Sequence, residues 1–66
     1  NSILSRGVRV EKGARVSNCV LMQGTTIHAG AVLKYAIADK NVQVNPGRML
    51  MGHSTYPLAI SKNETV

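Results

Sequence analysis

The chain has 66 residues, and its eight Lys and Arg against three Asp and Glu give a formal net charge of +5 at pH 7. A chain of this length forms at most one small domain with a modest core. It contains neither an apolar run long enough to cross a bilayer nor a basic-then-apolar leader, so we expect no membrane association and a cytoplasmic location. Only two aromatic residues accompany the positive charge, without a helix-turn-helix pattern, which disfavours nucleic-acid binding.

Three consecutive stretches fall into register when they are written seventeen residues apart, beginning at Asn1, Asn18 and Tyr35. The aligned columns are Ile3, Val20 and Ile37; Leu4, Leu21 and Ala38; Val10, Ile27 and Val44; Val16, Leu33 and Leu50; and Gly13, Gly30 and Gly47. Stacked coils require such columns, because each coil buries its aliphatic side chains against the equivalent residues of its neighbours. The period therefore predicts an all-β solenoid.

Within each unit the aliphatic positions recur six, six and five residues apart, as in Leu4, Val10 and Val16. This hexapeptide spacing predicts three short strands in each coil. The adjacent aliphatic residues Val20 and Leu21 cannot both face the interior of a regular strand. Because the shorter spacing of five precedes such pairs, we expect a distorted corner at that point of each coil.

Glycine occupies the same position between predicted strands in every unit, at Gly13, Gly30 and Gly47. Because glycine tolerates positive φ, these residues are predicted to form equivalent corners where the chain turns from one face to the next. A helix is disfavoured, since glycine recurs about every six residues and no stripe with i, i+3, i+4 spacing is sustained.

The third unit departs from the pattern at Asp39, Pro46 and Arg48. An unpaired arginine cannot enter a narrow coil interior, so we expect the third coil to be open on its outer side and to end the stack. The sequence thus predicts about three coils over residues 1–52. Residues 53–66 show no repeat, and we expect them to form a C-terminal cap that lies across the last coil.

The hexapeptide frame resembles left-handed parallel β-helix proteins, and the handedness is implied by that resemblance alone. Four short segments point to a narrower family: the openings N-S-x-L and N-C-V-L-M, the D-K-N-V stretch and the Y-P-L segment. They are similar to the C-terminal β-helix of bacterial ADP-glucose pyrophosphorylases, also called glucose-1-phosphate adenylyltransferases, and most similar to the GlgD-type subunit of glycogen biosynthesis. The resemblance covers nearly the whole chain.

The resemblance implies a structural or regulatory oligomerisation domain, which packs on a catalytic domain and joins subunits into homo- or hetero-oligomers. The family's nucleotidyltransferase domain is absent from these residues, so no catalytic, cofactor-binding or metal-binding residue carries over. Mg²⁺ is implied only for the parent enzyme, which makes ADP-glucose and pyrophosphate from ATP and glucose 1-phosphate. The chain begins at Asn1, without Met, which predicts a fragment of a longer solenoid. We expect this fragment to self-associate, either by end-to-end stacking or by side-by-side packing of its faces.

The alternative function is a hexapeptide-repeat acyltransferase, which would need a histidine as general base. His28 and His53 are the two candidates, and the sequence shows no evident acidic partner for either, so we interpret both as surface histidines. The single cysteine, Cys19, is predicted to be a small packing residue, and no Cys or His cluster indicates a metal.

The remaining functional signal is a set of cations. Arg6, Arg9 and Arg15, with Lys40 in the same column as Arg6, are candidate contacts for an anionic effector. Arginine binds phosphate oxygens in a fork geometry, which suits such a ligand. The alternative is that these side chains are solvated charges that keep the strands from aggregating.

Overall fold

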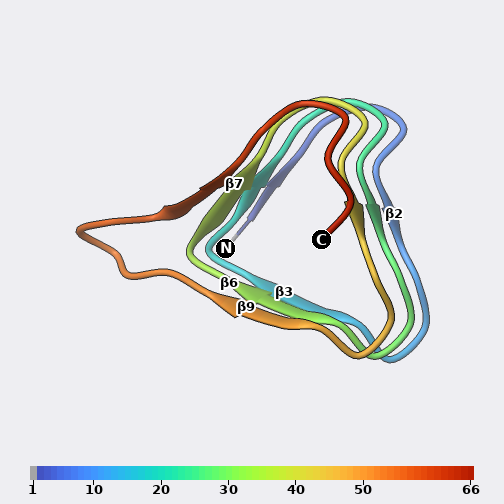
Figure 1. Ribbon diagram of the computed structural model, residues 1–66, viewed down its shortest axis with the longest axis horizontal. Helices are drawn as coiled ribbons and strands as arrows, with labels where there is room; N and C mark the ends of the chain where they lie inside the picture. The colour runs from blue at the N-terminus through green and yellow to red at the C-terminus, as the bar shows by residue number, and fades with distance from the viewer. Residues whose placement is uncertain (1) are drawn as a thin grey trace.

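The computed structural model describes residues 2–66, and they wind into a three-sided coil that contains strands and turns but no helix (Figure 1). The strands are β1 (Ile3–Leu4), β2 (Arg9–Val10), β3 (Arg15–Ser17), β4 (Val20–Leu21), β5 (Thr26–Ile27), β6 (Val32–Lys34), β7 (Ala36–Ala38), β8 (Gln43–Val44), β9 (Met49–Met51) and β10 (Leu58–Ile60). In Figure 1 the chain turns clockwise as it advances towards the viewer, so the winding is left-handed. The predicted all-β, left-handed parallel β-helix is confirmed.

Three parallel sheets form the three sides of the coil. Sheet A contains β1, β4, β7 and β10 in this order, sheet B contains β2, β5 and β8, and sheet C contains β3, β6 and β9. In sheet A, Ile3 pairs with Val20 and Val20 pairs with Ile37, which is the seventeen-residue offset read from the sequence. Sheets B and C keep the same offset. Successive coils therefore place equivalent residues directly above one another.

The core lies inside the coil, where the inward side chains stack in columns. It consists of Cys19, Leu21, Ile27, Ala31, Leu33, Ala36, Ala38, Val42, Val44 and Ile60. Most of these residues belong to the second and third coils, which have neighbours on both sides. Leu21 is completely buried, whereas Leu4, the equivalent residue of the first coil, is 52% exposed. Burial thus depends on the presence of a covering coil, as expected for a stack.

The strands of sheet A keep regular alternation despite the shorter spacing before them. Cys19 and Leu21 point inward, and Val20 between them lies on the outer face. The corners before β4 and β7 are made by Asn18 and Tyr35, which adopt φ of 53° and 52°. The spacing of five, one residue shorter than the others, is therefore accommodated by a residue with positive φ at the corner, and the strand itself is undistorted.

The corner between sheets B and C is formed by a column of glycines. Gly13, Gly30 and Gly47 have φ of +83°, +75° and +73°. They also stack closely, because a Cβ placed on Gly13 would lie 3.7 Å from the backbone nitrogen of Gly30. The position thus requires a residue that adopts positive φ without a penalty.

Replacing Gly30 with valine is expected to lower the free energy of unfolding by about 1 to 3 kcal/mol, because a β-branched residue is strained at this φ. Gly30→Asn is the matched control, since Asn41 already adopts a φ of 57° in this fold. Urea denaturation followed by circular dichroism measures both variants. An equal loss for the two variants would show that the added volume, and not the backbone strain, is limiting.

The segment 53–66 continues the winding over the third coil. Strand β10 lies beside β7 with Ala59 opposite Ile37, and Thr65 forms a further parallel bridge with Gln43. The loop between β9 and β10 makes this turn longer than the others, which is why no repeat is visible in the tail. The tail therefore covers sheets A and B as a partial fourth coil, while β9 remains an edge of sheet C.

Candidate functional site

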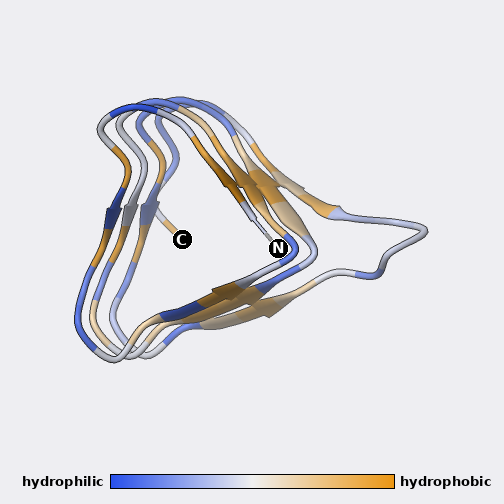
Figure 2. Ribbon diagram, turned by 180° about the vertical axis from the view of Figure 1, so that it is seen from behind, coloured by the Kyte–Doolittle hydropathy of each residue, from blue (hydrophilic) through white to orange (hydrophobic). Residues whose placement is uncertain are grey.

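The outer face of sheet A carries a row of aliphatic side chains, one from each coil. We call the row of Ile3, Val20, Ile37 and Ala59 the apolar stripe. Ile3 is 66% exposed and Ile37 is 38% exposed. Figure 2 shows the strands of this sheet in hydrophobic colours and the corner that follows them in hydrophilic colours. This face is therefore the side of the coil with the longest continuous apolar surface.

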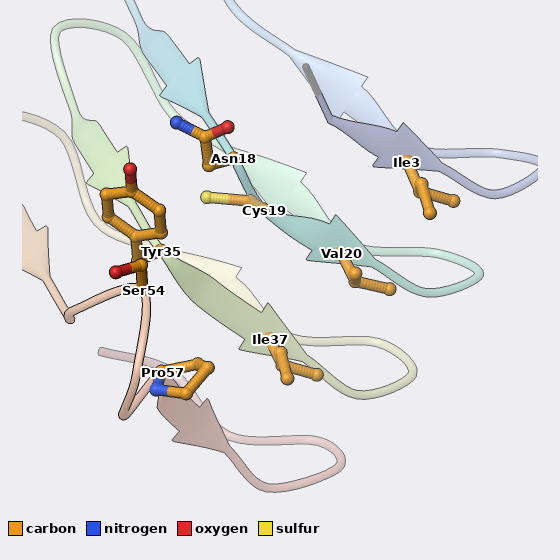
Figure 3. Close-up of a pocket in the computed structure, with 8 residues that line it drawn as sticks. All are labelled: Ile3, Asn18, Cys19, Val20, Tyr35, Ile37, Ser54 and Pro57. Atoms are coloured by element: carbon orange, nitrogen blue, oxygen red, sulfur yellow. The ribbon is translucent and has the colours of Figure 1, made fainter.

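A groove of about 340 Å³ lies along one edge of the apolar stripe (Figure 3). It is lined by Ile3, Asn18, Cys19, Val20, Tyr35, Ile37, Ser54 and Pro57. The floor is sheet A, and the far wall is the loop between β9 and β10, which projects from the coil at this corner. The groove thus combines an aliphatic floor with an aromatic ring and a few polar groups at one end.

Backbone hydrogen bonds hold the projecting loop in place. The Gly52 N–H donates to the Lys34 carbonyl at 2.7 Å, and the Leu58 N–H donates to the Tyr35 carbonyl at 3.0 Å. Between these two anchors His53 and Tyr56 form an antiparallel bridge. The loop therefore starts and ends on one corner of the coil, and the wall that it contributes to the groove is fixed.

Tyr35 was not singled out by the sequence analysis as a functional residue. It occupies the column of Asn1 and Asn18, and its φ of 52° is unusual for a bulky side chain. Its N–H donates to the Ser17 carbonyl at 3.1 Å, which holds the backbone in this conformation. An aromatic residue in a column of asparagine was the signal that could have identified it.

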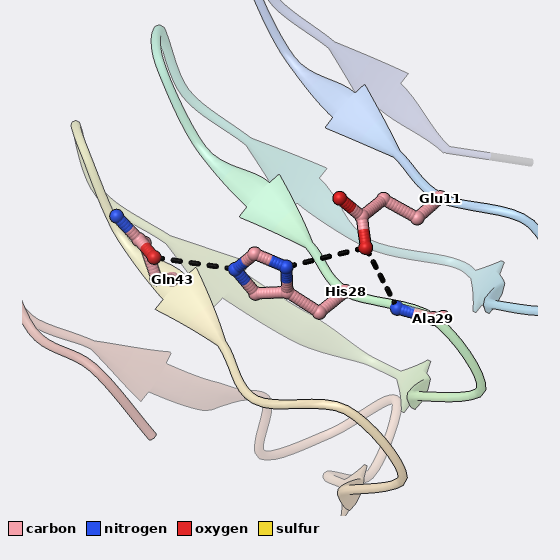
Figure 4. Close-up of polar contacts among 4 residues, drawn as sticks. All are labelled: Glu11, His28, Ala29 and Gln43. Carbon is pink, nitrogen blue, oxygen red and sulfur yellow. Dashed lines mark hydrogen bonds and ion pairs between the residues drawn. The ribbon is translucent and has the colours of Figure 1, made fainter.

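His28 lies on the outer face of sheet B in a polar array that joins three coils (Figure 4). Its Nδ1 lies 3.2 Å from Oε1 of Glu11, and its Nε2 lies 3.2 Å from Oε1 of Gln43. The same Glu11 oxygen accepts a hydrogen bond from the Ala29 N–H at 3.1 Å. The expectation that His28 has no acidic partner is therefore wrong, because Glu11 is its neighbour in the preceding coil.

The array leaves neither ring nitrogen of His28 free. A general base needs one unprotonated nitrogen that faces the substrate and a second group that orients the ring. Glu11 supplies the orienting group, but Gln43 occupies the position where a substrate would be bound. His53 lies exposed in the projecting loop, where its backbone pairs with Tyr56. In this geometry His28 links coils by hydrogen bonds.

The candidate cations lie on different sides of the coil. Arg9 is on the outer face of sheet B and Arg15 is on that of sheet C, where they pair with residues of the next coil. Arg6 and Lys40 share the corner after sheet A. Lys62 lies at the same corner, because Ile60 pairs with Ala38 and the two lysines each follow these residues by two positions. The second coil places Gln23 between Arg6 and Lys40 in this column. We call its three cations, Arg6, Lys40 and Lys62, the cation row. The sequence analysis missed Lys62 because the tail does not follow the period.

Cys19 is 2% exposed, and its Sγ donates to the Ser17 carbonyl at 3.2 Å, so its prediction as a packing residue is confirmed. Among residues 2–66, no group of three His, Cys, Asp or Glu side chains could hold a metal ion. The same residues include no helix that is long and apolar enough to span a bilayer.

Comparison with curated proteins finds relatives of one kind. The glucose-1-phosphate adenylyltransferase of Corynebacterium jeikeium (strain K411) is 54% identical over 50 residues, which cover 76% of this chain and 12% of that protein. The enzyme of the same name from Corynebacterium diphtheriae is 46% identical over 50 residues, with the same two shares. That of Frankia casuarinae is 49% identical over 47 residues, covering 71% of this chain and 11% of the relative. The chain thus spans only about 12% of the length of these relatives.

No solved structure gives a significant match to the chain. Residues 1–55 match the family described as GlmU-like, C-terminal hexapeptide, which is most of the chain. This match agrees with the hexapeptide spacing, the three parallel sheets and the seventeen-residue register. The chain therefore belongs to the GlmU-like C-terminal hexapeptide family.

Proposed function

We propose that the chain is a structural and regulatory C-terminal domain of an ADP-glucose pyrophosphorylase subunit, acting in glycogen biosynthesis in the cytoplasm. The observation that carries the proposal is the 54% identity over 50 residues to a protein named glucose-1-phosphate adenylyltransferase. In this proposal the parent protein makes ADP-glucose and pyrophosphate from ATP and glucose 1-phosphate. The chain itself contributes association with catalytic subunits, in homo- or hetero-oligomers.

The chemistry of the described residues supports a role other than catalysis. The Mg²⁺ implied by the family resemblance does not fit residues 2–66, where no three potential ligands come together. We therefore assign nucleotidyl transfer and its metal to a part of the parent protein outside this chain. The exposed side chains of the apolar stripe and the half-exposed Leu4 supply surface for association instead.

Co-expression with a full-length catalytic enzyme tests the proposal. A tagged form of this chain is expected to retain the Corynebacterium jeikeium enzyme on a column, and Met22→Ser is expected to weaken retention about tenfold or more. Met22 is 36% exposed and lies two residues beyond Val20 on the outer face of sheet A. Met49→Ser, on the outer face of sheet C and 67% exposed, is the matched control. Failure of the unchanged chain to retain the enzyme would contradict the proposal.

The acyltransferase alternative gains one supporting feature, the Glu11 carboxylate beside His28. The purified chain is therefore also incubated with acetyl-CoA and with amine and sugar acceptors, and acetyl transfer is measured. We expect no acetyl transfer, because Nε2 of His28 is engaged by Gln43. Acetyl transfer that disappears in His28→Ala would replace the proposed function with the acyltransferase.

A further inference from the structure

The apolar stripe lacks ionic side chains along its length, whereas the other two sides of the coil carry exposed cations. Arg9 projects from sheet B, and Arg15 and Lys34 project from sheet C. On sheet A the stripe residues Ile3 and Ile37 remain exposed. Exposed apolar surface therefore runs over successive coils on this side of the structure and is bordered by polar groups.

The cation row lies at the edge of this face without an acidic partner. Within residues 2–66 one ion pair is present, between His28 and Glu11 on another side of the coil. Asp39, the acid closest in sequence to the row, uses Oδ1 to accept a hydrogen bond from the Lys40 N–H at 2.7 Å. Lys40 and Lys62 occupy equivalent positions in adjacent coils, and neither forms an ion pair among residues 2–66, so both are available to an acidic partner.

The opposite edge of the face is raised, because the projecting loop and the Tyr35 ring border the groove there. Tyr35, Ser54 and Pro57 border the groove there (Figure 3), and Tyr35 keeps a left-handed backbone conformation in order to stand at this corner. Asn18 adopts the same conformation at the equivalent corner, so the corner geometry sets this φ and places the Tyr35 ring beside the groove. The face therefore has an aliphatic floor and an aromatic edge, and its other edge carries the cation row with the Asp39 carboxylate beside Lys40.

The dimensions of the face fit a single helix better than a second copy of the chain. Four coils about 4.8 Å apart give a stripe about 14 Å long, and strands of two or three residues make it about 10 Å wide. That area is far below the roughly 800 Å² that each partner of a stable dimer buries. A single helix of about ten residues has the same length as the stripe.

We propose that the outer face of sheet A docks one amphipathic helix whose apolar side lies on the apolar stripe and whose acidic flank faces the cation row. Such a helix presents apolar residues at i, i+3, i+4 and i+7, as in other helix-in-groove contacts. The groove beside Tyr35 and Pro57 receives the largest of these side chains. This surface deepens the proposed structural function and rests on it, since it names the kind of segment that the domain holds.

The probe for the test is a side-chain-bridged helical peptide of about twelve residues, with leucine at the four apolar positions and glutamate along one flank. A second peptide carries lysine in place of each glutamate. Titration of the ¹⁵N-labelled chain is expected to shift the amide signals of Val20, Ile37 and Lys40 with the glutamate peptide. The lysine peptide is expected to bind about tenfold more weakly or not at all, and raising the salt concentration is expected to reduce this difference.

Two variants with matched controls locate the contact. Ile37→Thr is expected to weaken binding of the glutamate peptide about fourfold, and Lys40→Glu is expected to weaken it about fivefold. Met49→Thr also replaces an exposed apolar side chain with threonine, and Lys34→Glu makes the same charge reversal as Lys40→Glu. Both lie on sheet C and are expected to leave the affinity unchanged. Equal effects of a variant and its control, or signal shifts confined to sheets B and C, would overturn the proposal.

Two further outcomes separate this inference from the proposed function. If the chain retains the full-length enzyme but Ile37→Thr and Lys40→Glu do not weaken retention, the docking surface is wrong and the structural role stands. If the peptide binds as expected but the enzyme is not retained, the parent assignment fails and the surface stands. Signal shifts of the sheet A face that grow with concentration of the chain alone would overturn the helix in favour of a second copy.

Discussion

Replacing Leu21 with alanine is expected to lower the free energy of unfolding by about 2 to 5 kcal/mol. Leu21 is completely buried and lies in one column between Leu4 and Ala38. The substitution removes buried apolar contacts and leaves a cavity that the neighbouring coils cannot fill, because backbone hydrogen bonds fix the distance between coils. Domains of this size have only several kcal/mol of stability, so a large fraction of the variant is expected to be unfolded.

Leu4→Ala provides a control with the same residue type, the same substitution and the same column. Leu4 is 52% exposed because no described strand covers β1 on its other side. Its replacement is expected to cost less than half as much as that of Leu21, since about half of the Leu4 side chain is already in water. Urea unfolding followed by circular dichroism measures both losses. Equal losses at the two positions would contradict the role of neighbouring coils in burial.

Replacing Gly52 with alanine is expected to displace the projecting loop and loosen β10. A Cβ at this position would lie 2.3 Å from the Tyr35 carbonyl oxygen and 2.5 Å from the Leu58 nitrogen, and both are backbone atoms. Since neither atom can move without breaking the Leu58-to-Tyr35 hydrogen bond, overpacking is expected to cost about 1 to 3 kcal/mol. Amide hydrogen exchange measures the change, and faster exchange is expected at Leu58 and at Asp39, which donates to the Ile60 carbonyl.

Gly47→Ala is the control for this substitution. It adds the same methyl group at a corner where nothing lies within 4 Å of the new Cβ, although its φ of +73° carries some backbone strain. Its effect is expected to be a modest general loss of stability, with protection of the β10 amides unchanged relative to that of the other strands. If Gly52→Ala also leaves the Leu58 amide protected, the loop has relaxed without loss of the hydrogen bond and the prediction is wrong.

The period made most of the fold predictable from the sequence. Equivalent residues in a stack touch one another, so the columns that contain Leu21, Ile27 and Leu33 report core contacts directly. The same rule pairs His28 with Glu11, which share a column, whereas a search for an acid near His28 along the sequence does not find it. Neither approach finds Gln43, because it lies two residues before Asn45, the residue that shares the His28 column in the following coil.

The features that escaped prediction depend on the projecting loop. The additional residues between β9 and β10 change the offset of the last turn, so the position of Lys62 beside Lys40 cannot be read from the period. The groove also depends on Ser54 and Pro57, which approach Tyr35 only because the loop folds back on its own corner. Long-range geometry of this kind has no local sequence signal.

The position of the projecting loop has a consequence for how such coils are recognised and engineered. The family match ends at residue 55, inside the loop, although the winding continues through β10 to the bridge at Thr65. The match therefore ends before the partial fourth coil, whose residues do not follow the seventeen-residue spacing. Because the strands on either side keep their register across the loop, the same corner is a natural point for grafting a tag or a foreign domain without disturbing the stack.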